Sequence, residues 1–98
     1  MGNVQSALFL MNQATQLIAN GNATIGQIGL AKAYASKLVR EAASLARESL
    51  GGNGILLDNY VMKAFMDIES YHTYEGTFDI NLLVAGRELT GVAAFKTR

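Results

Sequence analysis

The chain has 98 residues, 50% of them hydrophobic and 16% charged, so it can form at most one small domain, since domains usually contain about 100–150 residues. Eight Lys and Arg balance eight Asp and Glu, and this net charge of zero provides no basic surface for nucleic acid. The apolar content excludes a disordered chain, and the absence of Cys excludes disulfides and thiolate metal sites.

The first third of the chain carries no charge, because no Asp, Glu, Lys, Arg or His occurs between Met1 and Ala31. A free-standing helical domain places charges on its exposed faces, so we expect this segment to be buried against the rest of this chain or against another chain. Its apolar stretch, Val4 to Ile18, is interrupted by Gln and Asn and is shorter than the ~20 residues that cross a bilayer. We therefore expect a soluble protein without a membrane span, and a reducing, intracellular compartment fits the absence of Cys.

Two long helices are predicted in the first half of the chain. The first runs from about Val4 to Ala19 and ends at Asn20-Gly21. The second begins at Thr24, where Thr24-Ile25-Gly26-Gln27 has the form of a capping box. Apolar or small residues then recur with alternating spacings of three and four, which predicts a long helix with a narrow, Ala-rich seam: Ile28, Ala31, Ala35, Leu38, Ala42, Leu45 and Ser49.

Two further helices are predicted in the second half. Glycines at 51, 52 and 54 end the long helix, and a shorter helix is expected from about Asn59 to Ser70. A second break at Glu75-Gly76-Thr77 precedes a last helix, which Thr77 caps and whose apolar positions continue to Phe95. The predicted fold is an all-α bundle of three to four helices that forms a single domain over residues 1–98.

The first glycine-containing joint, Leu50–Gly54, has two interpretations. Three glycines in four residues expose backbone N–H groups that can approach an anion such as a phosphate. Phosphate sites usually place the glycines before a helix, whereas these follow a helix C-terminus, whose dipole repels anions. From this motif alone, an ordinary helix end and turn is favoured.

The second joint, Tyr74-Glu75-Gly76-Thr77, places a carboxylate beside Gly76 and near the aromatic rings of Tyr71 and Tyr74. A carboxylate that is desolvated in such surroundings can act as a general base. A solvated loop Glu explains the same letters and is favoured from the tetrapeptide alone.

The remaining polar residues predict structural roles. His72 is the only histidine, so we expect a half-exposed polar residue and no metal site. Arg47-Glu48 and Arg87-Glu88 are interpreted as solvated or intrahelical pairs, with a bridge between subunits as the alternative for either arginine.

Taken in order, these motifs resemble the C-terminal helical domain of the acyl-CoA dehydrogenase and acyl-CoA oxidase family, and the resemblance covers nearly the whole chain. The sequences from His72 to Ile80 and from Gly86 to Gly91 are most similar to the glutaryl-CoA dehydrogenase branch and to related short-chain acyl-CoA oxidases. The motifs that carry the resemblance are Leu50-Gly51-Gly52-Asn53-Gly54, Tyr74-Glu75-Gly76-Thr77, Asp79-Ile80 and Gly86-Arg87-Glu88.

The resemblance implies a site. Glu75 would be the base that removes the α-proton of an acyl-CoA thioester, while FAD accepts a hydride from the β-carbon. Tyr74 and Gly76 would bind the substrate, and Thr77 would lie against the FAD. The glycines at 51, 52 and 54 would contact the FAD of a neighbouring subunit, which implies a homo-oligomer, a dimer or a tetramer.

Members of this family are several times longer and add an N-terminal helical domain and a middle β domain. We therefore expect residues 1–98 to be the C-terminal part of an FAD-dependent acyl-CoA dehydrogenase or oxidase, inactive as an isolated chain. The alternative is a non-catalytic helical module that self-associates through its uncharged segment. A small acyl-CoA carrier bundle is a third, weaker interpretation.

Overall fold

The structure is a computed structural model that describes residues 1–95, and every element in it is a helix. Within this part of the chain there is no β-strand, which confirms the predicted all-α fold. The elements are α1 (Gly2–Ala19), α2 (Ile25–Ser49), the short 3-10 helix η1 (Gly51–Ile55), α3 (Tyr60–Thr73) and α4 (Phe78–Thr90).

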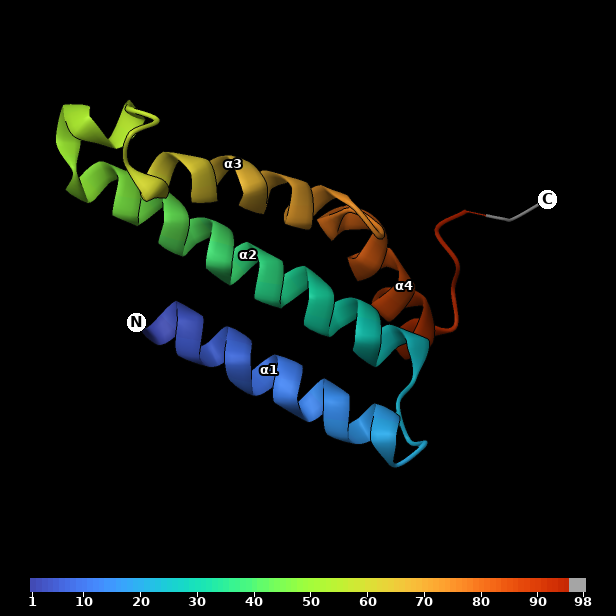
Figure 1. The fold of residues 1–98 in the computed structure, drawn as a ribbon. Helices are drawn as coiled ribbons and strands as arrows, with labels where there is room; N and C mark the ends of the chain where they lie inside the picture. Colours follow the sequence, from blue (N-terminus) through green and yellow to red (C-terminus); the bar gives the residue numbers. More distant parts are fainter. Residues whose placement is uncertain (96–98) are drawn as a thin grey trace.

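The helices are arranged around α2, which lies in the middle (Figure 1). α1 runs along one side of α2, while α3 and α4 follow one another along its other side. The molecule measures 47 × 31 × 17 Å, so its thinnest dimension is less than two helix diameters. Within residues 1–95, no helix combines the length and hydrophobicity that a membrane crossing requires.

Small residues of α2 make this arrangement possible, because helix axes approach closely only where side chains are short. The predicted seam is confirmed at Ala31 and Ala35 but is wrong at Ile28 and Leu45, which are 43% and 58% exposed, and at Ser49, which is also exposed. A helix with neighbours on two sides cannot be described by one narrow stripe. The buried residues of α2 are all Gly or Ala: Gly26, Gly29, Ala31, Ala33, Ala35 and Ala43.

The helix ends follow local hydrogen bonding. The capping box at Thr24 is confirmed, since its side chain accepts from the Gln27 N–H and the Gln27 side chain accepts from the Thr24 N–H. Thr77 caps α4 by accepting from the Ile80 N–H at 3.2 Å. The predicted continuation of this helix to Phe95 is wrong, because Gly91 at φ +74° takes a left-handed conformation that ends α4 at Thr90.

Glu88 ties the end of α4 to the start of α2. Its carboxylate accepts from the Thr24 hydroxyl at 2.5 Å and from the Gly26 N–H at 2.7 Å. Arg87 and Glu88 are both exposed, as the solvated alternative predicts, whereas an intrahelical ion pair between them does not form. Among residues 1–95 the ion pairs are Arg40–Glu69 at 2.7 Å, between α2 and α3, and Lys63–Asp67 at 3.5 Å, within α3.

We call the hydrogen bonds that Glu88 accepts from Thr24 and Gly26 the Glu88 clamp. This clamp explains why residue 26 is glycine, since a Cβ there would overlap the Glu88 carboxylate. We expect Gly26→Ala to displace that carboxylate and to lower the free energy of unfolding by about 1–3 kcal/mol, measured by urea unfolding followed by circular dichroism. Gly86→Ala is the matched control, because a Cβ there meets nothing within 4 Å and helical Ala is favoured over Gly. An equal loss in both variants would contradict the clamp.

Candidate functional site

The loop between α3 and α4 contains the predicted base, and its backbone is unusual. Glu75 adopts φ +56°, and within residues 1–95 it is the one residue other than glycine that has a positive φ. Gly76 follows at φ +91°. The left-handed conformation costs an ordinary residue about 1–2 kcal/mol, so surrounding contacts must hold Glu75 there.

Two side chains from different helices hold this loop through one carbonyl. Lys32 of α2 donates from Nζ to the Gly76 carbonyl at 2.7 Å and to the His72 carbonyl at 3.2 Å. Asn81 of α4 donates from Nδ2 to the same Gly76 carbonyl at 2.9 Å. The Gly76 carbonyl therefore has one donor from α2 and one from α4.

Lys32 is half-buried, and its environment changes its titration. Desolvation by burial lowers the pKa of the Lys32 amine, and the nearby Glu75 carboxylate partly offsets this by favouring the charged form. Lys32 was not among the site residues predicted from the sequence. One signal was available, because Lys32 is the first charged residue in the chain and lies between two of the Ala residues that α2 buries.

Aromatic rings pack on both sides of the joint. The rings of Tyr71 and Tyr74 lie 5.5 Å apart, and His72 stacks on Phe78 at 5.8 Å. The prediction that His72 is a half-exposed polar residue is confirmed, with its Nδ1 at 3.5 Å from the Ser36 hydroxyl. Packing of His72 on Phe78 joins the last turn of α3 to the first turn of α4.

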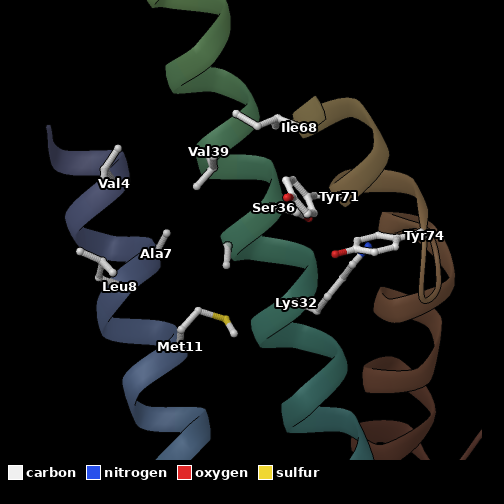
Figure 2. A pocket seen from close by; sticks show the side chains of 11 residues that line it. Val4, Ala7, Leu8, Met11, Lys32, Ser36, Val39, Ile68, Tyr71 and Tyr74 are labelled. Carbon is white, nitrogen blue, oxygen red and sulfur yellow. The ribbon is translucent and has the colours of Figure 1, made fainter. Parts of the chain in front are cut away.

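An apolar groove lies between α1, α2 and α3 and ends at this joint (Figure 2). We call it the α1–α3 groove, and its volume is about 360 Å³. The Lys32 side chain extends from its floor toward the Tyr74 ring, with Nζ 6.0 Å from the ring centroid. Its walls include Val4, Leu8, Met11, Val39, Tyr71 and Tyr74.

The predicted site residues around Glu75 are brought together, but they are not desolvated. Gly76 is half-buried, whereas Glu75 and Thr77 are exposed and Tyr74 retains 53% exposure. Within residues 1–95 the exposed Glu75 agrees with the interpretation favoured from the tetrapeptide, a solvated loop Glu. The rings of Tyr71 and Tyr74 pack against each other and leave the Glu75 carboxylate uncovered.

The first glycine-containing joint, Leu50–Gly54, which we call the glycine segment, lies at the opposite end of α3 from the loop that contains Glu75 (Figure 1). Because α3 has 14 residues at ~1.5 Å each, its two ends are about 21 Å apart. The segment forms the 3-10 helix η1 rather than a plain turn. Gly51 and Gly52 are exposed, with open space where a Cβ would lie, whereas Gly54 is buried and a Cβ there would overlap the Arg47 carbonyl.

Metal binding finds no support in the described part of the chain, where no three His, Asp or Glu side chains gather closely enough to hold an ion. The chemistry that the joint offers is that of one exposed carboxylate on a fixed backbone, beside an ammonium and two phenol rings.

Comparisons with known proteins show the family. Residues 1–90 match the C-terminal domain of acyl-CoA dehydrogenases, and the chain belongs to this family. A crystal structure of glutaryl-CoA dehydrogenase from Mycobacterium smegmatis is 34% identical over 91% of this chain, with a TM-score of 0.84. A glutaryl-CoA dehydrogenase structure from the same organism, in complex with FADH2, is 33% identical over 90%, with a TM-score of 0.83.

The resemblance to the glutaryl-CoA dehydrogenase branch is thereby confirmed. This chain spans 23% of the length of each of these two proteins. The joint and the glycine segment both lie within the matched residues 1–90.

The glycine segment yields a test of which glycine is structural. We expect Gly54→Ala to lower the free energy of unfolding by about 1–3 kcal/mol, because the Arg47 carbonyl that a Cβ would overlap belongs to the backbone and cannot rotate away. Gly52→Ala is the matched control and should leave stability unchanged or slightly raised, since its Cβ enters open space. Equal thermal unfolding midpoints for Gly54→Ala and Gly52→Ala would contradict the close packing of Gly54 against the Arg47 carbonyl.

Proposed function

We propose that this chain is the C-terminal part of an FAD-dependent acyl-CoA dehydrogenase or oxidase, in which Glu75 removes the α-proton of an acyl-CoA thioester. The observation that carries the proposal is the left-handed backbone of Glu75, held by two donors on the next carbonyl. Strained backbone of this kind concentrates at functional sites, where it fixes a reacting group. The family match over residues 1–90 supports the reaction class.

In the proposed reaction the substrate thioester lies against Tyr74 and Gly76. A Glu75 carboxylate oxygen takes the proton from the α-carbon, and the electron pair of that C–H bond forms the double bond between the α- and β-carbons. Bound FAD supplies the acceptor for the hydride that leaves the β-carbon. Substrate that covers the exposed Glu75 would exclude water from this step.

The chain offers two separate surfaces to the cofactor. Thr77 lies at the start of α4, and its hydroxyl still has a proton to donate while its oxygen accepts from the Ile80 N–H. Gly51 and Gly52 have open space around their backbone, so a phosphate can approach closely. These surfaces lie at opposite ends of α3, and in the proposed assembly they contact two FAD molecules, one of them bound by a neighbouring copy, which requires a homo-oligomer.

The test requires the remaining domains of a full-length relative. We would replace the matching C-terminal quarter of the Mycobacterium smegmatis glutaryl-CoA dehydrogenase with residues 1–98 and assay turnover with an artificial electron acceptor. Glu75→Gln should lower turnover by roughly 10²–10⁴-fold, because the amide cannot accept the proton. Glu41→Gln, an exposed carboxylate of α2, is the control. Unchanged turnover in Glu75→Gln would refute the proposed role.

A second candidate function, a self-associating helical module, is favoured by the outer face of α1. Ala7 is buried toward α2, and Phe9, two residues later, points away from it and is 63% exposed. Leu8 is 53% exposed, and no charged side chain borders them on α1. Such uncharged apolar surface is typical of an interface.

We expect the 98-residue chain to sediment as a species larger than its monomer mass of 10.5 kDa. Phe9→Asp should shift it toward the monomer, because a charge would be buried in the association surface. Asn22→Asp adds the same charge in the exposed loop after α1 and should leave sedimentation unchanged. A monomeric wild-type chain would remove this candidate.

A further inference from the structure

We propose that Lys32 is a positioning residue for Glu75: its amine fixes both ends of the loop that presents the carboxylate. The inference rests on the proposed function of Glu75 and adds a residue from a different helix to it.

The hydrogen bonds of Lys32 enclose Glu75. One carbonyl that it contacts, that of His72, belongs to the last turn of α3, where helix carbonyls lack partners within the helix. The other, that of Gly76, directly follows Glu75. One ammonium therefore joins the segment before Glu75 to the segment after it.

The backbone that carries this amine is fixed by helix packing. Lys32 lies between Ala31 and Ala33, which are 7% and 0% exposed, so its backbone is in the packed centre of the molecule. The side chain crosses from α2 to the α3–α4 joint beside the Tyr74 ring (Figure 2). Movement of the Glu75 loop would require Lys32 to leave two acceptors in a partly desolvated place.

Asn81 provides the second half of the support. It donates to the Gly76 carbonyl from α4, and a Cβ at Gly76 would lie 3.1 Å from its side-chain oxygen. Gly76 is therefore held through its carbonyl by both Lys32 and Asn81. With the backbone after Glu75 held from α2 and α4, the direction of the Glu75 Cα–Cβ bond is set before substrate binds.

The main experiment uses the same chimera with Lys32→Met, Lys32→Arg and the control Lys63→Met, an exposed lysine of α3. We expect Lys32→Met to lower kcat by roughly 10- to 100-fold, because a displacement of about 1 Å at a reacting group has effects of this size. Lys32→Arg should recover part of the loss, since guanidinium also donates to two carbonyls. Lys63→Met should match the parent.

The isotope effect separates positioning from a general loss of folded enzyme. Misplaced Glu75 slows proton removal in particular, so the effect of α-deuterated substrate on kcat should rise in Lys32→Met. A smaller fraction of folded enzyme would lower kcat and leave the isotope effect unchanged, and that result would overturn the inference. If Glu75→Gln is inactive while the kcat of Lys32→Met equals that of Lys63→Met, the positioning role of Lys32 is refuted and the proposed function stands. If Glu75→Gln is fully active, the proposed function fails first.

A second measurement applies to the 98-residue chain itself and needs no catalysis. Lys32→Met should shift the amide NMR resonances of residues 73–77 and speed their hydrogen exchange, and Asn81→Asp, which cannot donate to the Gly76 carbonyl, should do the same. Lys63→Met should leave them in place. Unchanged resonances of residues 73–77 in both Lys32→Met and Asn81→Asp would overturn the inference, whether or not the chimera turns over.

Discussion

The close approach of three helices to α2 is the constraint on which the rest of the structure depends. It is possible because α2 presents only Gly and Ala at its buried positions. At Gly29 a Cβ would already lie 3.3 Å from the Asn81 carbonyl of α4. Larger residues there would push α4 outward, and with it the joint that carries Glu75. Packing at the centre of the molecule therefore sets the position of the loop at its edge.

The same constraint leaves the molecule thin. The helices around α2 bury only alanines among the apolar residues. Within residues 1–95 no large apolar side chain is fully buried. Apolar residues instead remain exposed along α1, and a groove stays open between α1 and α3. Domains normally bury such surface in a core shared by two layers. Glu75 is exposed for the same reason, because these helices leave the α3–α4 joint uncovered.

The loop at the α3–α4 joint combines local strain with support from a distance. Glu75 takes a backbone conformation that its own side chain disfavours, and the contacts that maintain it come from Lys32 and Asn81. Glu88 adds a third tie, because it fastens the far end of α4 to the start of α2. Donors on α2 and α4, together with the Thr77 cap, thus hold the short loop in place.

The sequence by itself determined the helices and the family. Hydrophobic spacing, the cap residues Thr24 and Thr77 and the glycine breaks depend on neighbours within four residues, so they can be recognised without a fold. The end of the last helix was predicted wrongly, because apolar residues continue past Gly91, whereas that glycine takes the left-handed conformation that ends α4. The motif that contains Glu75 was also recognisable, since its residues are consecutive.

Only the tertiary structure decided what surrounds that motif. Lys32 and Glu75 are 43 residues apart, and Glu88 lies 62 residues from Gly26, so no local pattern pairs them. The burial of Gly and Ala in place of Ile28 and Leu45 likewise depends on which helices touch α2. Hydrogen bonds between distant residues are fixed by helix packing, and helix packing is a property of the whole fold.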